Sequence, residues 1–400
     1  HFMKLFQRLL VAPAALGLFS PLAANATEVN LNDISNYSDV ESIELANAFD
    51  NNDSTKSPLL AGGEGLVDSH DGGFSETTTA SFTADFLVGA VDGKDVTAAK
   101  VDGDEDVQTA YSFQIDLNTS FTGEDSLDIS LDAGNALSGT GSNTPASPLL
   151  EFDPNTDGDG LVVDGVSYTF PLGDSTTVIV GDNTDGSALF TTACLYGGSD
   201  TMSNCGVPNA GITGGGVALG AAYDFGTGFT AAFGYQTSPT GFGTKESADS
   251  YALNAAYIGD SYGVSFTYGS AEAGTANVYE KTNDYLGLNA YYSFDNGMSV
   301  NAGYEVGTLG SAASTADETL AYFFGVQGEV GAGTLGAAIG TAGSMTEVAG
   351  TITEAMMYEA YYSYPVNDGM TVTPLIYIKE DTEATNPDET GIMVKTSFSF

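Results

Sequence analysis

The side chains of this chain that could do chemistry are overwhelmingly carboxylates. Its 400 residues include 53 Asp and Glu against 9 Lys and Arg, which gives a formal net charge of −44 at pH 7. A surplus of this size attracts cations and repels anions. It also leaves no basic surface that could neutralise phosphates, so nucleic acid is excluded as a partner.

One acidic stretch has the spacing of a calcium-binding loop. Its candidate ligands are Asp153, Asn155, Asp157, Asp159 and Asp164. No helices are predicted beside them, an Asp replaces the usual terminal Glu, and Asp/Gly turns are common in acidic surface loops. We therefore favour a plain surface loop and keep calcium, the one cofactor the sequence suggests, as a minority hypothesis.

Enzymatic interpretations find little support in the residues. A Gly-x-Ser-x-Gly motif occurs at Gly259-Asp260-Ser261-Tyr262-Gly263. It lies in a predicted strand-to-strand turn, whereas a nucleophile elbow joins a strand to a helix. A serine nucleophile also needs a base, and His70 is the only histidine beyond the first residue. We expect no enzymatic activity.

The first residues of the chain indicate export. A short basic stretch and an apolar run, Leu9 to Leu22, precede Ala24-Asn25-Ala26, which offers small residues at both recognition positions of a signal peptidase. We predict a signal peptide over residues 1–26, in which the two residues before Met3 are a start-site remnant. A flexible acidic periplasmic leader is predicted over residues 27–73.

Export also bears on the two cysteines, Cys194 and Cys205, which share one stretch rich in Gly, Ser and Asn. Disulfides form in oxidising compartments, so we predict a local disulfide that staples a loop. A metal-binding or catalytic thiol is disfavoured because no histidine lies nearby.

The elements that must position these side chains are β-strands. From Thr77 to the last residue, apolar and polar residues alternate with period two, which suits a strand with one face in lipid and one in water. No segment beyond the signal approaches the length of a transmembrane helix. We predict an all-β fold, a transmembrane antiparallel β-barrel over residues 74–400. Its sixteen candidate strands are 77–90, 108–121, 125–133, 161–171, 175–181, 213–224, 228–236, 247–258, 261–269, 283–294, 297–306, 318–328, 332–340, 354–364, 369–379 and 390–400.

The connections between these strands alternate in length, as short periplasmic turns and longer outer loops do in outer-membrane barrels. An even strand number places both chain ends on the periplasmic side. The apolar row of each strand is predicted to meet lipid, and the polar row to line the pore with Asp85, Gln114, Asp116, Asn118, Asp128, Asp132, Glu305, Glu359, Lys379 and Lys395. Four acids share the apolar parity but open strands that descend from long loops, at the outer rim where a charge costs about 0–1 kcal/mol: Asp249, Asp284, Glu318 and Glu354.

The chain ends on an alternating strand, Ile392 to Phe400. Phe398 and Phe400 resemble the signal that the outer-membrane barrel assembly machinery recognises, so this machinery is an expected partner. The physical reason is that the closing strand must pair, since no membrane-spanning sheet can leave an edge open.

Three stretches carry a family resemblance: Tyr111 to Asn135, Tyr168 to Gly181 and Tyr361 to Phe400. They resemble the cyanobacterial-type porins, often called iron-uptake porins, of the carbohydrate-selective porin superfamily. The resemblance covers about residues 77–400 and implies a sixteen-stranded general porin, usually trimeric, that passes small solutes. Most members carry a surface-layer-homology domain and a coiled coil after the signal, whereas this chain has only Ser38-Asp39-Val40 and the acidic leader there.

The expected function is a water-filled channel in the outer membrane of a Gram-negative-type cell, for passive diffusion of small hydrophilic solutes and ions, sugars included. Relatives commonly carry arginines on the inner face of the first hairpin. Asp116 and Asp128 stand in that region here, so an anion preference is not carried over. Because the acids of the predicted pore-lining row outnumber its two lysines, we predict cation preference. The long third loop of sixteen-stranded porins folds inward, which makes Asp182, Asp185 and Asp200 candidates for an eyelet; solvated loop acids remain an equal alternative.

Two other classes of protein fit the same pattern: a plugged barrel with a structural or adhesive role, and a soluble acidic secreted β-protein. For the porin, the expected partners are outer-membrane lipid, lipopolysaccharide, small solutes and the two further copies of a homotrimer. The sequence leaves the preferred solute open among sugars, inorganic ions and iron species.

Overall fold

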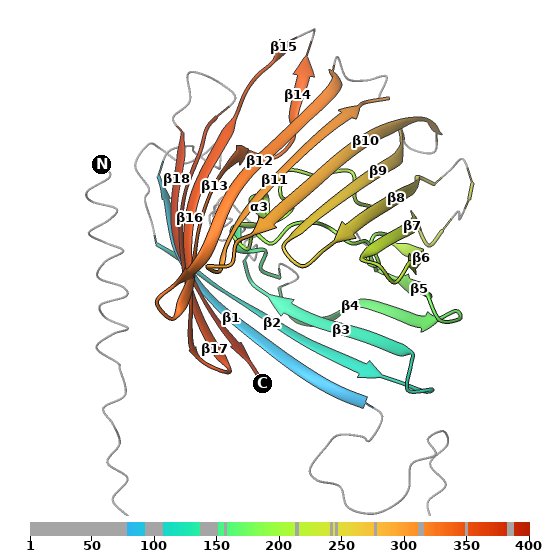
Figure 1. Ribbon diagram of the computed structural model, residues 1–400, viewed down its shortest axis with the longest axis horizontal. Coiled ribbons are helices and arrows are strands. Elements are labelled where there is room, and N and C mark those ends of the chain that lie inside the picture. The colour runs from blue at the N-terminus through green and yellow to red at the C-terminus, as the bar shows by residue number, and fades with distance from the viewer. Residues whose placement is uncertain are drawn as a thin grey trace, which may run out of the picture. The chain divides into compact units, whose positions relative to one another are not determined.

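Antiparallel strands make up nearly all of the regular structure in the part of the chain that the computed structural model describes (Figure 1). The described residues are 78–92, 107–136, 151–155, 158–212, 216–240, 243–244, 247–275, 278–310, 316–348, 351–381 and 388–400. The predicted signal peptide and leader lie outside them. Within the described residues, no helix is both long and apolar enough to cross a membrane.

The strands follow one another along the chain with one short helix between the fifth and the sixth. The first nine are β1 (Thr78–Asp92), β2 (Gln108–Thr119), β3 (Ser126–Gly134), β4 (Gly158–Pro171), β5 (Thr176–Asp182), β6 (Val217–Asp224), β7 (Phe229–Thr237), β8 (Asp249–Ile258) and β9 (Tyr262–Thr275), with α3 (Asp200–Ser203) after β5. The remaining nine are β10 (Val278–Ser293), β11 (Met298–Thr308), β12 (Ala316–Val330), β13 (Gly333–Thr341), β14 (Met345–Val348), β15 (Thr351–Ile352), β16 (Met356–Asn367), β17 (Met370–Lys379) and β18 (Glu389–Ser399).

All eighteen described strands belong to one sheet, and neighbours in the sequence pair antiparallel. The short β14 and β15 form a hairpin that extends β12, while β13 pairs directly with β16. Without that hairpin, 18 − 2 = 16 strands form the wall. β1 pairs with β18 from Thr83 and Ser399 to Asp92 and Thr390, which closes the sheet into a barrel. The predicted sixteen-stranded antiparallel barrel is confirmed.

The seam of this barrel includes the last residue of the chain. Phe82 and Phe400 exchange both backbone hydrogen bonds, with N to O distances of 3.0 and 3.1 Å. Their rings stack with centroids 5.5 Å apart. The closing edge is therefore satisfied to its end, which a sheet without free edges requires.

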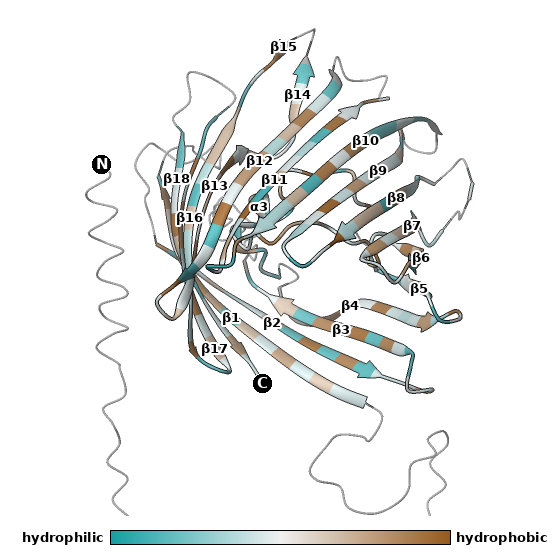
Figure 2. Ribbon diagram, in the orientation of Figure 1, coloured by the Kyte–Doolittle hydropathy of each residue, from teal (hydrophilic) through white to brown (hydrophobic). Residues whose placement is uncertain are grey.

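Residue parity separates two faces along the wall, as Figure 2 shows by the alternation of hydropathy along the ribbons. On β8 and β11, Leu253 and Tyr304 are 49% and 48% exposed, whereas Asn254 and Glu305 next to them are buried. Alternate side chains of a strand point to opposite faces. The apolar row of these strands therefore faces away from the lumen, and the polar row faces into it.

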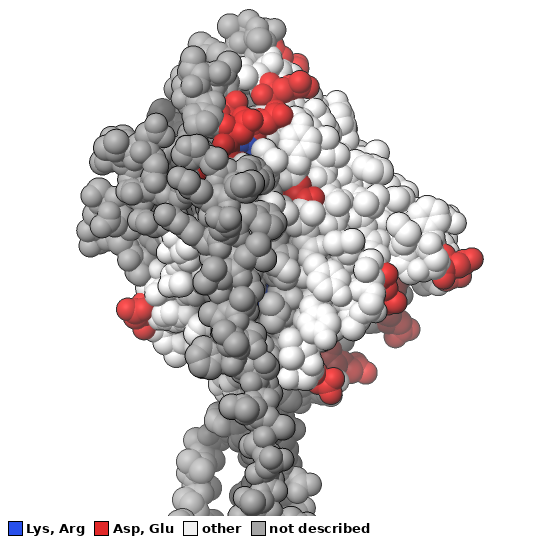
Figure 3. Space-filling model, turned by 90° about the vertical axis from the view of Figure 1, so that its left-hand side faces the viewer, with Lys and Arg blue, Asp and Glu red and all other residues white. Residues whose placement is uncertain are grey.

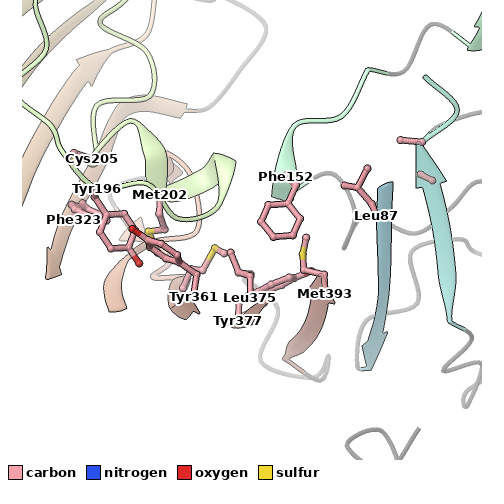
Figure 4. Packing of buried hydrophobic residues seen from close by; sticks show 13 residues of the cluster. Leu87, Phe152, Tyr196, Met202, Cys205, Phe323, Tyr361, Leu375, Tyr377 and Met393 are labelled. Carbon is pink, nitrogen blue, oxygen red and sulfur yellow. The ribbon is translucent and has the colours of Figure 1, made fainter. Parts of the chain in front are cut away.

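One sector of the wall has an apolar inward row as well. Inward side chains of β12, β16, β17, β18 and β1 pack with Phe152, Tyr196 and Met202 in one buried cluster (Figure 4). The wall residues of this cluster include Phe323, Met357, Tyr361, Leu375, Tyr377, Met393 and Leu87. The alternation of the sequence, which assigned the inward row to channel water, did not predict this dry sector.

The turn between β2 and β3 is built around Asp125. One of its carboxylate oxygens accepts from the Ser120 and Thr122 hydroxyls and from the Phe121 and Thr122 amides, at 2.7 to 3.0 Å. The other accepts from the Tyr168 hydroxyl at 2.6 Å. The Tyr168 hydrogen bond, followed by those from Thr122 and Ser120, lowers the pKa of Asp125 below its ordinary value. The ionised carboxylate therefore holds the turn.

We expect Asp125→Asn to lower the midpoint of thermal unfolding at pH 7. A carboxyl with a depressed folded-state pKa contributes stability that is complete above the unfolded value, about 3.9, and is lost as the pH falls below it. The difference between wild type and variant should therefore shrink as the pH is lowered from 5 to 2. Glu124→Gln, an exposed neighbour, is the control; a difference that stays constant with pH would contradict this role.

Candidate functional site

The connection between β5 and β6 enters the lumen; we call residues 183–212 the inner loop. Alternate backbone amides of its first arm donate to inward side chains of five different strands. The pairs are Thr191 with Asn254, Ala193 with Ser265, Leu195 with Asn301, Gly197 with Gln327 and Ser199 with Glu359, at 2.8 to 3.1 Å. This arm is therefore an extended chain that lies across β8, β9, β11, β12 and β16. Figure 1 shows it with α3 inside the ring of strands.

The returning arm of the inner loop is held by a second carboxylate. Glu305 of β11 accepts from the Asn209 amide at 2.8 Å, the Ala210 amide at 2.7 Å and the Asn209 side chain at 2.8 Å. On β10, the Asn289 side chain donates to the Cys205 carbonyl at 3.0 Å. Hydrogen bonds to an ionised acceptor are roughly twice as strong as neutral ones. Glu305 and Glu359, predicted to face the channel, are placed against the inner loop instead.

The two arms of the inner loop are joined by a disulfide. Cys194 and Cys205 are bonded, their Cα atoms are 6.0 Å apart, and α3 lies between them in the sequence. Cys205 is fully buried. The link therefore closes the tip of the loop into a ring on the lumen side of the wall.

Glycines in the inward row let the loop approach the wall. A Cβ built on Gly303 of β11 would collide with the Cys205 carbonyl oxygen, and one on Gly269 of β9 would collide with that of Ala210. Neither glycine has a positive φ. Lack of a side chain, rather than unusual backbone geometry, is what the loop requires at these positions.

A second segment, residues 151–155, lies against the lumen side of the wall; we call it the inward segment. Asn155 donates from its backbone amide to the Ser112 hydroxyl and from its side chain to the Phe113 carbonyl, both at 3.0 Å. Phe152 joins the buried apolar cluster, and the Lys395 ammonium lies 5.0 Å from its ring centroid. The inward segment thus covers part of β18, β1 and β2.

The described parts of the inner loop and the inward segment leave part of the wall between β2 and β4 open. A hollow of about 600 Å³ lies there, with residues of β2, β3, β4 and the start of the inner loop around it. Four of its eleven lining residues are acidic, and none is Lys or Arg: the acids are Asp116, Asp128, Asp164 and Asp185.

Two of these acids belong to a hydrogen-bonded lattice on the inner wall. Asp116 accepts from Gln114 at 2.9 Å and from Ser130 at 2.6 Å. Asp128 accepts from Asn118 and from Ser126, at 2.6 and 2.7 Å. Their carboxylates are therefore oriented by neighbouring strands, while their hollow stays open. Of the predicted pore-lining residues, these two acids face open space most clearly.

The other predicted residues have varied positions. Asp85 is half-buried on β1, Asp132 is buried on β3, Asp182 is exposed at the end of β5 and Asp200 is exposed at the start of α3. Among the eyelet candidates, Asp185 lines the hollow. Sequence reasoning missed the loop anchors on the wall, because an inward Asn or Gln reads the same whether it meets water or a loop amide: Asn254, Asn289, Asn301 and Gln327.

The calcium candidates contact different partners. Asn155 binds the β2 wall, the Asp159 carboxylate accepts from the Tyr111 hydroxyl at 2.8 Å, and Asp164 lines the hollow. Asp157 lies outside the described residues. Among the described residues, no three His, Cys, Asp or Glu side chains are grouped so that they could hold a metal ion. Calcium binding stays a prediction, for which a melting temperature measured through a calcium titration is the test.

The sequence matches no known family model, and no curated protein is significantly similar to it. The fold is shared with solved structures. OprB of Pseudomonas putida superposes with a TM-score of 0.58 at 12% identity, over 81% of this chain and 94% of that chain. A loop-deletion form of OmpT, an outer membrane protein of Vibrio cholerae, superposes with a TM-score of 0.56 at 12% identity, over 81% of this chain and 100% of that chain. A mutant porin of Rh. blastica superposes with a TM-score of 0.53 at 15% identity, over 81% of this chain and 100% of that chain. At these identities the likeness shows the fold, an outer-membrane type of barrel.

We expect Gly303→Val to displace the returning arm of the inner loop. The added side chain would overlap the Cys205 carbonyl, and overpacking of this kind costs about 1–3 kcal/mol. The Cys194–Cys205 disulfide should then be reduced by a soluble dithiol roughly tenfold faster, as followed by alkylation and mass spectrometry. Gly160→Val on β4, where a Cβ meets nothing within 4 Å, is the matched control. Equal rates in the two variants would contradict the close approach.

Proposed function

We propose that this chain is an outer-membrane porin: a water-filled channel through which small hydrophilic solutes and ions diffuse passively, with a preference for cations. Three features support the proposal. The barrel has the fold of solved outer-membrane porins, its outer surface suits a membrane, and its lumen keeps an acidic hollow beside an inner loop.

The outer surface has an apolar band with different chemistry at its two ends. Aromatic rings cluster at the end with the short turns. The ring centroids of Phe229 and Tyr257 are 4.6 Å apart, and those of Tyr292 and Phe294 are 4.9 Å apart. Aromatic girdles of this kind mark the membrane interfaces of barrels.

At the other end of the outer surface, tyrosine hydroxyls donate to acids, as Tyr268 does to Asp284 at 2.9 Å and Tyr358 to Glu380 at 3.2 Å. Figure 3 shows acidic side chains toward the ends of one face, around a largely uncharged band. Asp284 of β10 and Phe294, the residue after β10, bound a stretch that rises about 33 Å along the strand, or about 25 Å at a tilt near 40°. This height matches the apolar band of outer-membrane barrels.

The observation that carries the proposed function is the hollow at β2 to β4. Fixed carboxylates in a water-filled, low-dielectric channel concentrate cations and repel anions. Asp116, Asp128, Asp164 and Asp185 supply four such charges around the hollow. Of the two predicted lumen lysines, Lys379 is paired with Glu151 and Lys395 lies over the Phe152 ring. The charge around the hollow is therefore negative.

We expect the wild-type protein to form conducting channels in planar bilayers, with K⁺ permeating better than Cl⁻ under a salt gradient. The double variant Asp116→Asn, Asp128→Asn removes two of the four hollow charges. Its cation to anion permeability ratio should fall about twofold or more, because the local potential of a charged channel is several kT.

The control for this experiment is Asp295→Asn, which removes an acid in the turn between β10 and β11 and should leave the ratio unchanged. An unchanged ratio in the double variant would refute the selectivity but not the channel. A wild-type barrel that never conducts would refute the channel itself and favour the plugged structural or adhesive barrel. The dry sector from β12 to β1 is the observation that favours this alternative.

The finer features of this function are also part of the proposal. We infer an outer-membrane location in a Gram-negative-type cell, contact with lipid and lipopolysaccharide, insertion by the barrel assembly machinery through Phe398 and Phe400, and a homotrimer. The resemblance to cyanobacterial-type porins supports the last of these. Liposome swelling with sugars of graded size would establish the solute class.

A further inference from the structure

One lysine lies where the inner loop and the inward segment meet. The Lys379 ammonium is 3.0 Å from one Glu151 carboxylate oxygen, and the Glu151 side chain is 7% exposed. The other Glu151 oxygen accepts from the amide of Thr201, in α3, at 3.4 Å. A chain of contacts thus runs from β17 through the inward segment to the tip of the inner loop.

Acids surround this contact on every side. Glu151 and Asp153 belong to the inward segment, Asp200 begins α3, and Glu359 on β16 binds the Ser199 amide just before α3. Glu389 is the residue of β18 directly opposite Lys379. Burial, then the Asp153 and Glu151 carboxylates, raises the pKa of Asp200, whereas Lys379 acts in the opposite direction.

Without a cation here, the inward segment and α3 would meet as two acidic surfaces. Like charges at short range repel, and the repulsion is stronger where water is partly excluded. Lys395, an inward lysine of β18, contacts the Phe152 ring instead. Lys379 is therefore the cation placed to hold the two elements together.

We propose that Lys379 is a positioning residue that clasps the inward segment to the inner loop. The closed clasp seals the lumen beside β16 to β18 and leaves the acidic hollow at β2 to β4 as a path for permeating ions. This inference rests on the proposed channel function. It assigns Lys379 a mechanical role, in contrast to a lysine that acts on ions only through its field.

The clasp is tested by the width of the channel in Lys379→Met, Lys379→Arg and Lys395→Met. Loss of the cation at position 379 should open a second path beside the hollow and raise single-channel conductance about twofold. The conservative Arg variant should conduct like wild type, and so should Lys395→Met. Heat-modifiable migration on gels verifies that each variant contains a folded barrel.

Acid provides the second arm of this test. As the pH is lowered, the Asp200 carboxyl, whose pKa is raised, becomes protonated early, which reduces the repulsion between the inward segment and α3. The ratio of the conductance of Lys379→Met to that of wild type at the same pH should then return toward one. A lysine acting only through its field would change ion preference with no change in the size of sugar that permeates, and this result would overturn the clasp.

A readout independent of conduction separates failure of the clasp from failure of the channel. Because α3 lies within the ring closed by Cys194 and Cys205, its release should speed reduction of the disulfide by a soluble dithiol in Lys379→Met but not in Lys379→Arg. Equal rates would refute the clasp even if the wild type conducts. Faster reduction in a protein that never conducts would uphold the clasp and refute the porin.

Discussion

A chain that runs inside a barrel must find partners for its backbone amides, and this requirement determines the arrangement of the lumen. From β8 to β16 the wall makes six steps between neighbouring strands, about 29 Å in all, while the four two-residue steps from Thr191 to Ser199 span about 26 Å. The two lengths nearly agree. An extended arm can therefore lie across the strands and meet one acceptor at each alternate residue, provided that it passes over β10 and β13 without a bond. Unpaired buried amides are costly, so the arm is held in this register.

The position of the arm divides the lumen by chemistry. Where the inner loop and the inward segment cover the wall, the inward side chains pack against these segments or bond to them, as Phe323, Asn301 and Glu305 show. Where they leave it open, Asp116 and Asp128 line the hollow and are oriented by cross-strand bonds. The same period-two row thus forms a dry interface in one sector and lines an open hollow in another.

This division explains how far the sequence could be read. Sixteen strands and their two faces followed from alternation alone, because a membrane barrel imposes that pattern on every strand. The environment of each inward residue did not follow, since Glu305 and Asp116 are both inward acids and only the structure shows what lies above each of them. The close approach of the inner loop to Gly303 could not be predicted from the sequence either, because a glycine in a strand has several common explanations. The disulfide between Cys194 and Cys205 could be predicted without knowing the position of the loop, because the two cysteines are close in sequence.

The net charge of the chain is consequently a poor guide to the charge of the proposed channel. Most of the 53 acids need not affect a permeating ion, since acids at the ends of the outer surface are screened within about 10 Å at ordinary ionic strength, and Glu305 and Glu359 are committed to loop amides. Lys379 and Lys395 are likewise engaged, by Glu151 and by the Phe152 ring. An ion in the lumen would meet only the carboxylates that the inner loop leaves uncovered. The position of the loop determines which carboxylates these are. A change in where the loop lies would therefore alter selectivity without any change in charge.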